Sequence, residues 1–198
     1  MTEENEKKEE EKELEVFPFI RGERIDLVAE NTKWIDLFCK WNNDPEVRRY
    51  SRNNWPRTIE ELKKWLEPPP RGQLREFITF TIYHKIDKRP IGNIGFGHIR
   101  WVDRNANIFA MIGEPEYWGK GIAGEASRLV IEYGFSELNL HKIYAGIYTP
   151  NERSHRAAEK LGFKKEGVFK EEEYVDGTYH DVHKYALFKR DWMKANEK

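Results

Sequence analysis

The chain has 198 residues, of which 38% are hydrophobic and 14% aromatic, so it can bury the core of one domain but not of two large ones. Lys and Arg number 34, and Asp and Glu number 35. The resulting formal net charge of −1 excludes a field over the whole molecule that would attract nucleic acid or an anionic membrane.

The N-terminal segment alternates Glu and Lys with almost no apolar residue, and we expect residues 1–15 to form a charged, solvated tail. A single domain then spans residues 16–198, because no repeat or linker divides it. The lack of an apolar signal region and of long apolar runs predicts a cytoplasmic protein that does not enter a membrane. Cys39 stands alone and therefore forms neither an internal disulfide nor a multi-cysteine metal site.

The first part of the domain predicts a strand followed by two helices. Residues 19–28 alternate apolar and polar side chains, as a half-buried strand does. A helix capped at Asn31 or its neighbour then presents an apolar stripe made of Trp34, Leu37, Phe38 and Trp41. Thr58 and Glu61 have the spacing of a capping box, which predicts a second helix that ends before Pro68.

Three strands follow these helices. Residues 77–83 and 91–99 are apolar-rich segments joined by a turn at residues 87–90, which predicts an antiparallel hairpin. A third strand at residues 106–112 extends the same antiparallel run.

The second half of the domain changes to strand, glycine loop, helix, strand, helix. An apolar stripe that begins at Ile122 predicts a helix directly after the loop, and residues 142–148 form a short apolar strand. Since a strand, helix and strand within one sheet need a parallel crossover, residues 106–112 and 142–148 should be parallel neighbours. A helix preceded by Asn151 and a hairpin at residues 168–187 complete an α+β fold, a mixed and mostly antiparallel sheet with helices on both faces.

The most informative segment is the glycine loop at residues 116–126, where a strand passes into a helix. Backbone N–H groups at such a junction can approach a phosphate closely, and the helix dipole favours an anion there. Gly119, Gly121 and Gly124 match the dinucleotide-binding pattern, but too little chain follows for a doubly wound sheet. A Walker loop fits less well, because Gly121 stands where a Ser or Thr should hold magnesium. A tight turn without a ligand remains the plain alternative.

This loop and the helix after it together resemble the RimJ/RimL-like branch of the GNAT N-acetyltransferase superfamily. Residues 118–123 match the family's Gln/Arg-x-x-Gly-x-Gly/Ala loop except at Trp118, a substitution common in this branch. Asn151, Ser154 and residues 159–163 match its second motif. The resemblance also includes an opening segment at residues 21–27 and a closing segment at residues 174–181. It therefore covers nearly the whole domain.

The resemblance implies that the chain binds acetyl-CoA as a co-substrate. The loop would hold the diphosphate of the coenzyme, and two parallel strands would splay to admit its pantetheine arm beside the backbone N–H groups of residues 108–112. The residues so assigned to the coenzyme are Ile112, Trp118, Gly119, Lys120, Gly121, Ile122, Ala123, Gly124 and Asn151. We expect no metal, because His180 and His183 lie three apart in a strand-like stretch and therefore on opposite faces.

Acetyl transfer to an amine needs a neutral nucleophile, a group that stabilises the oxyanion and a proton for the departing thiolate. Ala158 stands where many relatives carry a tyrosine that supplies this proton, so the resemblance indicates Ser154 as the donor. Asn151 would orient the pantetheine amide or the amine while it also caps its helix. Glu114 is the nearest carboxylate to act as the base, although a solvated side chain explains it as well.

These motifs predict an acetyl-CoA-dependent N-acetyltransferase that moves an acetyl group to a primary amine by direct transfer in a ternary complex. The amine would be a protein N-terminal α-amino group or a small molecule. The alternative is a non-catalytic acyl-CoA-binding or sensing protein, which the missing tyrosine would suit. The expected partner is therefore a small-molecule or peptide amine, without nucleic acid or membrane, and a homodimer is left open.

Overall fold

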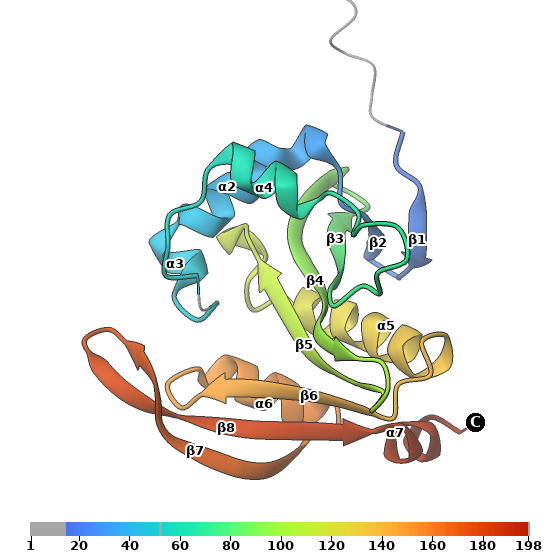
Figure 1. The fold of residues 1–198 in the computed structure, drawn as a ribbon, viewed down its shortest axis with the longest axis vertical. Helices are drawn as coiled ribbons and strands as arrows, with labels where there is room; N and C mark the ends of the chain where they lie inside the picture. Colours follow the sequence, from blue (N-terminus) through green and yellow to red (C-terminus); the bar gives the residue numbers. More distant parts are fainter. Residues whose placement is uncertain (1–14, 52, 198) are drawn as a thin grey trace, which may run out of the picture.

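The computed structural model describes residues 15–51 and 53–197, which form one mixed sheet with helices on both faces (Figure 1). The strands stand in the order β1-β2-β3-β4-β5-β6-β8-β7, and all neighbours pair antiparallel except β5 and β6. The strands are β1 Pro18–Arg21, β2 Ile25–Ala29, β3 Ile78–His84, β4 Arg89–Arg100, β5 Asn105–Ile112, β6 Lys142–Tyr148, β7 Lys164–Val175 and β8 Thr178–Phe188. The helices are η1 Thr32–Trp34, α2 Ile35–Asn43, α3 Pro45–Arg48, α4 Ile59–Trp65, η2 Pro115–Tyr117, α5 Ile122–Ser136, α6 Glu152–Lys160 and α7 Lys189–Asn196.

The predicted α+β fold with a mostly antiparallel mixed sheet is confirmed. Of the predicted charged tail, residues 1–14 lie outside the described residues. None of the helices in the described part of the chain combines the length and apolar character that crossing a bilayer requires.

The single strand predicted at residues 19–28 is instead two strands, β1 and β2, which form a hairpin around Gly22. The Gly22 N–H donates to the Ile25 carbonyl at 3.0 Å and to Asp26 Oδ1 at 3.2 Å. A Cβ on Gly22 would lie 2.4 Å from the Ile25 oxygen, so this turn requires glycine. The prediction was wrong because the alternation of apolar and polar residues continues while the chain reverses.

Helices α2 and α4 lie over one face of the sheet, at the end of β5. Phe38, Trp41 and Leu62 form a small core between them. The Trp41 ring lies so close to Gly113 that a Cβ there would come within 2.1 Å of it. Met111 packs against the same core, so this sheet face is covered by aromatic side chains of α2.

Side-chain caps set the beginnings of these helices. Thr58 Oγ1 accepts the Glu61 N–H at 3.2 Å and the Glu61 carboxylate accepts the Thr58 N–H at 3.0 Å, which confirms the predicted capping box. The short helix α3, which the sequence did not predict, begins after Asp44, whose Oδ1 accepts the N–H groups of Glu46 and Val47. Together α2, α3 and α4 cover one end of the cavity described below.

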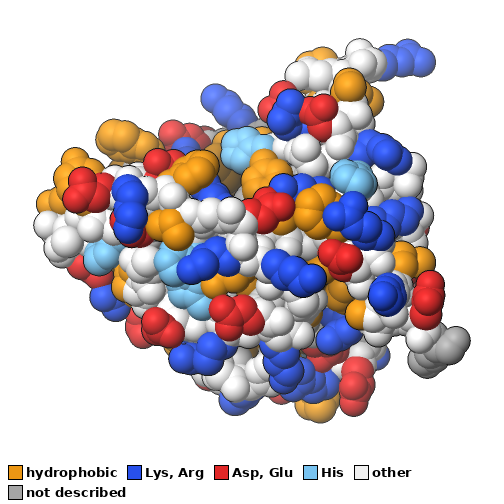
Figure 2. Space-filling model, turned by 90° about the horizontal axis from the view of Figure 1, so that it is seen from below, with side chains coloured by type: hydrophobic (Ala, Val, Ile, Leu, Met, Phe, Trp, Pro, Cys, Tyr) orange, Lys and Arg blue, Asp and Glu red, His pale blue; other side chains and the backbone are white. Residues whose placement is uncertain are grey.

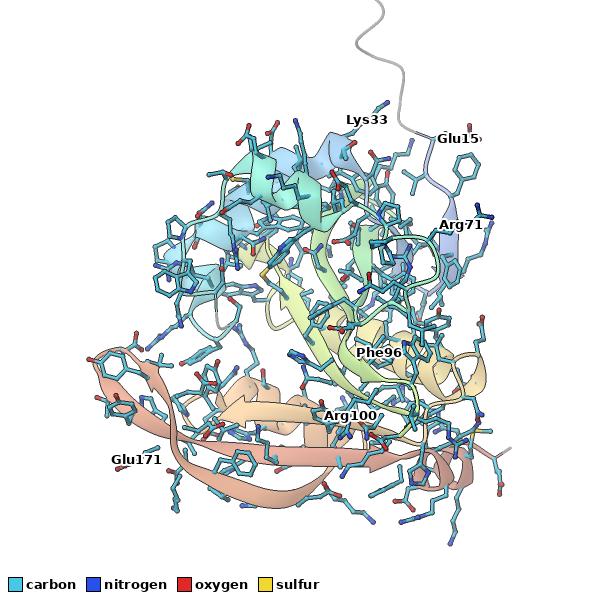
Figure 3. All side chains as sticks on the ribbon, viewed as in Figure 1. Glu15, Lys33, Arg71, Phe96, Arg100 and Glu171 are labelled. Carbon is cyan, nitrogen blue, oxygen red and sulfur yellow. The ribbon has the colours of Figure 1, made fainter. Side chains whose placement is uncertain are left out.

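Helix α5 covers the opposite face of the sheet. Phe96 of β4 lies between β4 and α5 (Figure 3). A Cβ on Gly134 of α5 would lie 2.6 Å from the Phe96 ring, so helix and sheet approach closely there. Ile94, Val130 and Ile131 are completely buried in the same layer. This core fixes where α5 begins, and hence the position of the glycine loop.

Beyond β5 the sheet continues through β6, β8 and β7, with α6 against β6 (Figure 1). The β7–β8 hairpin is longer than the predicted residues 168–187, and α7, which was not predicted, follows β8. Figure 2 shows basic and acidic side chains interspersed over the face seen from below in Figure 1.

β5 and β6 are the predicted parallel neighbours, but they pair only at their beginnings. The register joins Asn105 to Lys142, Ala106 to Ile143 and Asn107 to Tyr144, and records no pair beyond these. Figure 1 shows the two strands diverging from that point. The predicted splay is thus present, and it opens the sheet at its centre.

Candidate active site

A cavity of about 1440 Å³ occupies the opening between β5 and β6. Its walls are residues 108–112 of β5, the glycine loop and the beginning of α5 on one side, and the beginning of α6 on the other. Side chains of α2, α3 and α4, among them Phe38 and Trp65, line its far end. The cavity therefore connects the helix N-terminus of α5 with the sheet face beneath α2.

The edge of β5 that faces β6 has open backbone groups. The Gly113 N–H donates to the Ile91 carbonyl of β4 at 2.9 Å, so the backbone of Gly113 faces β4. Because successive residues of a strand direct their N–H groups to opposite sides, those of Ile112, Ala110 and Ile108 face away from β4, toward the opening. This edge can receive an extended, amide-bearing ligand as an added strand.

The glycine loop leaves the N-terminus of α5 uncovered. Gly119 and Gly121 have φ values of 74° and 79°, in the left-handed region that favours glycine. A Cβ on Gly119 or Gly124 would meet nothing within 4 Å, and one on Gly121 would meet only Arg24 Nη2 at 3.5 Å. Within the described residues no side chain caps this helix, so its first N–H groups can bind an anion.

Glu125 stands in the first turn of α5 but does not cap its own helix. Its Oε1 accepts the N–H groups of Glu23 at 3.0 Å and Arg24 at 2.8 Å. Its Oε2 accepts Arg24 Nε at 2.7 Å, while Arg24 Nη1 donates to the Lys120 carbonyl at 2.8 Å. Burial alone would raise the pKa of Glu125, but the bonds from Arg24 and Ile25 lower it below its ordinary value. The β1–β2 turn thus holds the glycine loop in place and keeps this carboxylate away from the anion site.

Trp118 and Arg153 connect the two sides of the cavity. Trp118 Nε1 donates to the Ile112 carbonyl at 2.8 Å, which fixes the loop to the end of β5. The Arg153 guanidinium from α6 lies 4.7 Å from the centroid of the Trp118 ring. With Arg24 and Arg128, Arg153 gives this end of the cavity cationic walls.

Asn151 and Ser154 lie where α6 begins, and both line the cavity. Asn151 Oδ1 accepts the Ser154 N–H at 3.2 Å, so Asn151 caps the helix. For Ser154 Oγ the described residues provide no hydrogen-bond partner. Its hydroxyl is therefore free to donate to a ligand.

Glu114 lies outside the cavity lining and is buried, with 4% of its surface exposed. Trp41 Nε1 donates to its Oε1 at 2.7 Å, Lys40 Nζ lies 3.2 Å from Oε1, and Arg89 Nη2 lies 3.1 Å from Oε2. Burial raises its pKa, but these three donors together lower it below the ordinary value. The structure thus makes Glu114 a paired anion that ties α2 to the end of β5, which argues against the base assigned to it from sequence.

A different carboxylate, Glu30, lines the cavity. It follows β2 directly, and its Oε1 accepts Asn93 Nδ2 of β4 at 3.4 Å. Burial raises the pKa of Glu30 to about 7, and the bond from Asn93 opposes this only in part. A carboxyl group in this state can accept a proton near neutral pH.

The structure brings together most of the residues that the sequence assigned. The assigned residues that line the one cavity are Ile112, Trp118, Gly119, Gly121, Ile122, Ala123, Gly124, Asn151 and Ser154. Lys120 does not line it; its Nζ lies 5.6 Å from the Tyr117 ring, and it is the Lys120 carbonyl that holds Arg24. Within residues 15–51 and 53–197, no group of three or more His, Cys, Asp or Glu side chains is placed to hold a metal ion.

Three residues of the site were missed by the sequence analysis: Arg24, Arg153 and Glu30. Arg24 belongs to the opening segment that was noted without a role, and Arg153 precedes Ser154 in the second motif. Glu30 is one of 35 acidic residues and carries no local signal. Only the fold shows that it is desolvated.

Comparisons with known proteins agree with this geometry. Residues 28–164 match the family model described as Acetyltransferase (GNAT) domain. The uncharacterized N-acetyltransferase YoaA of Bacillus subtilis is 33% identical over 177 residues, which cover 88% of this chain and 98% of YoaA. Spermidine N(1)-acetyltransferase of Escherichia coli K12 is 35% identical over 146 residues, 69% of this chain and 78% of that protein. The structure of spermidine N-acetyltransferase from Vibrio cholerae in complex with CoA and spermine has a TM-score of 0.78 and 25% identity, and the match covers 86% of this chain and 98% of the other.

Proposed function

This chain belongs to the GNAT acetyltransferase family and is an N-acetyltransferase, and we propose that it moves the acetyl group of acetyl-CoA to a primary amine while both are bound. One observation supports this above all. The open edge of β5, the uncovered N-terminus of α5 and the Ser154 hydroxyl line one cavity. Direct transfer needs all three in one place, because coenzyme and amine must meet there.

The residues present suit acetyl-CoA, which supplies an acyl group activated as a thioester. The positive-φ turn at Gly119 and Gly121 presents backbone N–H groups, and Arg24 and Arg153 add positive charge for the diphosphate. The N–H and carbonyl groups along residues 108–112 suit the amides of the pantetheine arm.

The chain's own groups cover the remaining needs of the reaction. A β5 N–H that faces the opening, from the set at residues 108, 110 and 112, stabilises the oxyanion. The Ser154 hydroxyl protonates the departing thiolate. Asn151 caps α6 and so holds Ser154 at the cavity wall; this agrees with a role in orienting the amine or the pantetheine amide.

The acceptor is a primary amine, either a small-molecule amine or a protein N-terminal α-amino group. Support for the amine class comes from the spermidine acetyltransferases among the relatives and from the free carboxylate of Glu30 in the cavity. Both acceptor types carry an ammonium group near pH 7, with pKa values of about 10.4 for an alkyl amine and about 7.7 to 8.0 for an α-amino group.

Calorimetry with acetyl-CoA and a thiol-release assay over an amine panel test the proposal. The panel should contain spermidine, a monoamine and a peptide with a free N-terminus. We expect binding of acetyl-CoA and release of CoA with at least one amine. Binding without release for every amine would instead support the non-catalytic acyl-CoA-binding alternative.

A further inference from the structure

Glu30 is a half-buried carboxylate to which the described residues provide no cation. Glu114 and Glu125, which are also withdrawn from solvent, are each held by a cationic side chain at 3.2 Å or less. Among residues 15–51 and 53–197, the Glu30 carboxylate accepts the long bond from Asn93 at 3.4 Å and forms no ion pair. An uncompensated carboxylate in such a place is costly unless a positive partner arrives.

Two polar atoms near Asn93 also lack a hydrogen-bond partner in the described residues. Thr81 of β3 and Asn93 of β4 are directly opposite each other in the register, on the sheet face beneath α2. Thr81 Oγ1 and Asn93 Oδ1 are both buried without a partner in the described part of the chain. Asn93 itself is 9% exposed and lines the cavity. Buried polar atoms of this kind are normally satisfied, and Asn93 Oδ1 can be satisfied only by a donor, so this acceptor is available to a water or to an N–H group of a ligand.

Two arginines of the cavity lining, one directly after α3 and one shortly before α4, are already engaged. Arg49, directly after α3, binds Asp176 of the β7–β8 turn through Nε at 2.9 Å, and Arg57 donates to Asn53 Oδ1 at 3.2 Å. Arg57 also lies 4.6 Å from the centroid of the Trp65 ring. Glu46 of α3 is an exposed carboxylate at the rim. The cavity-lining residues of α2, β3, β4 and β5 are uncharged.

The position of Glu30 relative to β5 suits a role in the reaction. Asn93, which holds Glu30, is paired with Met111 in the β4–β5 register. Met111 stands between Ala110 and Ile112, whose N–H groups face the opening. Asn93, the partner of Glu30, therefore lies on β4, the strand next to the β5 edge at which the thioester is proposed to bind, while Glu30 itself follows β2, two strands further along the sheet.

We propose that Glu30, oriented by Asn93, binds the ammonium group of the acceptor and takes its proton, directly or through one water. This inference rests on the proposed function and deepens it by naming the acceptor site. The O–H bond on Glu30 forms as the N–H bond of the ammonium breaks, which leaves a lone pair on the amine nitrogen. The C–N bond then forms as the C–S bond breaks. The departing thiolate takes a proton from Ser154, and the second proton that the amine nitrogen loses replaces it. The proton on Glu30 leaves to solvent.

The chemistry of the pair favours this transfer. An alkyl ammonium has a pKa of about 10.4, so only about one molecule in a thousand is a free amine in water near pH 7. Burial raises the pKa of Glu30 to about 7. This narrows the gap between donor and acceptor, and a low local dielectric further favours the neutral amine and carboxylic acid over the ion pair.

Glu30→Gln tests the proposal, because it retains an oxygen for the bond from Asn93 and removes only the charge and the basicity. With spermidine and an α-amino peptide as probes, we expect kcat/KM to fall at least a hundredfold while the Kd for acetyl-CoA stays within twofold. In the wild type, kcat/KM should rise with pH through about 7, and this limb should be absent from the variant. Glu60→Gln, the same change at an exposed position of α4, is the control and should leave both quantities unaltered.

The outcomes separate this inference from the proposed function. If the wild type acetylates amines and Glu30→Gln does so equally well with the same pH profile, the role of Glu30 is refuted and the function stands. If the wild type binds acetyl-CoA but acetylates no amine, both are refuted. Glu30→Asp keeps the carboxylate on a shorter side chain and should retain more activity than Glu30→Gln. The reverse order of activities would contradict a role in proton transfer.

Discussion

Arg24 Nε lies 2.7 Å from Oε2 of Glu125, so two residues 101 positions apart join the β1–β2 turn to the helix that follows the glycine loop. The same arginine donates to the Lys120 carbonyl within the loop. A carboxylate in the first turn of a helix ordinarily stabilises that helix's own N–H groups. Here it binds the neighbouring turn, and the N–H groups stay available for an anion.

Glu125→Gln should therefore weaken coenzyme binding without altering the chemistry. Loss of the charge frees Arg24 and loosens the loop, and we expect the Kd for acetyl-CoA to rise about tenfold, which corresponds to about 1.4 kcal/mol. The kcat at saturating coenzyme should stay within twofold. Calorimetry and steady-state kinetics measure the two quantities. Glu137→Gln, at the exposed C-terminal end of α5, is the control and should change neither.

Gly121→Ala should damage the anion site itself. Gly121 has a φ of 79°, where an L-residue is strained by about 1–2 kcal/mol, and relief of that strain would redirect the N–H groups of the loop. We expect acetyl-CoA affinity to fall at least tenfold. Gly177→Ala is a matched control, because Gly177 has a φ of 82° in the β7–β8 turn and an added Cβ meets nothing within 4 Å. Gly177→Ala should lower the melting temperature about as much as Gly121→Ala does, but it should leave the affinity for acetyl-CoA unchanged. An equal loss of affinity in both variants would contradict the assigned site.

The sequence was sufficient for the parts of this molecule that depend on local pattern or on connectivity. A strand, helix and strand in one sheet require a parallel crossover, and this rule alone placed β5 beside β6. Glycines at a strand-to-helix junction indicated the loop at Gly119 and Gly121, whose positive φ values the structure shows. The capping box at Thr58 was likewise readable, because its two partners are three residues apart.

The roles of the carboxylates were not readable, because they depend on contacts between distant segments. Glu114 precedes a proline and resembles a solvated loop residue, yet Trp41, 73 positions earlier in the chain, donates to it in a buried site. Glu30 looks equally ordinary, and its desolvation depends on the strand that carries Asn93, 63 positions later. Burial and charge pairing decide what a carboxylate can do, and neither has a signature in a short stretch of sequence.

Ser154→Ala should separate turnover from binding. The Ser154 hydroxyl lines the cavity and its Oγ has no hydrogen-bond partner in the described residues, so its loss removes little stability. We expect kcat to fall about a hundredfold if it protonates the thiolate, while the Kd for acetyl-CoA stays within twofold. Ser136→Ala, at an exposed position in the last turn of α5, is the control. Unaltered turnover in Ser154→Ala would remove the residue from the mechanism.

Glu30 also predicts how the stability of the free protein depends on pH. Its pKa rises from the ordinary 4.5 to about 7 on folding, so between these values the folded state holds more protons than the unfolded state. The free energy of unfolding therefore falls as pH rises through this interval, and the loss is complete above about pH 7. For this partly exposed group the loss is at most about 3 kcal/mol.

Glu30→Gln should consequently make the protein more stable above pH 7, although it makes the enzyme less active. The glutamine stays neutral, so the variant keeps above pH 7 the stability that the wild type loses, and its melting temperature at pH 8 should be higher by several degrees. At pH 4.5 the two proteins should melt alike. The pKa of His183 is also lowered, first by burial and then by neighbouring positive charge. Because both proteins contain His183, its contribution to the pH dependence of stability cancels when the two melting temperatures are compared. Scanning calorimetry from pH 4.5 to 8 measures the difference between them. A variant less stable than the wild type at pH 8 would mean that Glu30 has a cationic partner within the protein, and the vacancy for an ammonium group would then not exist.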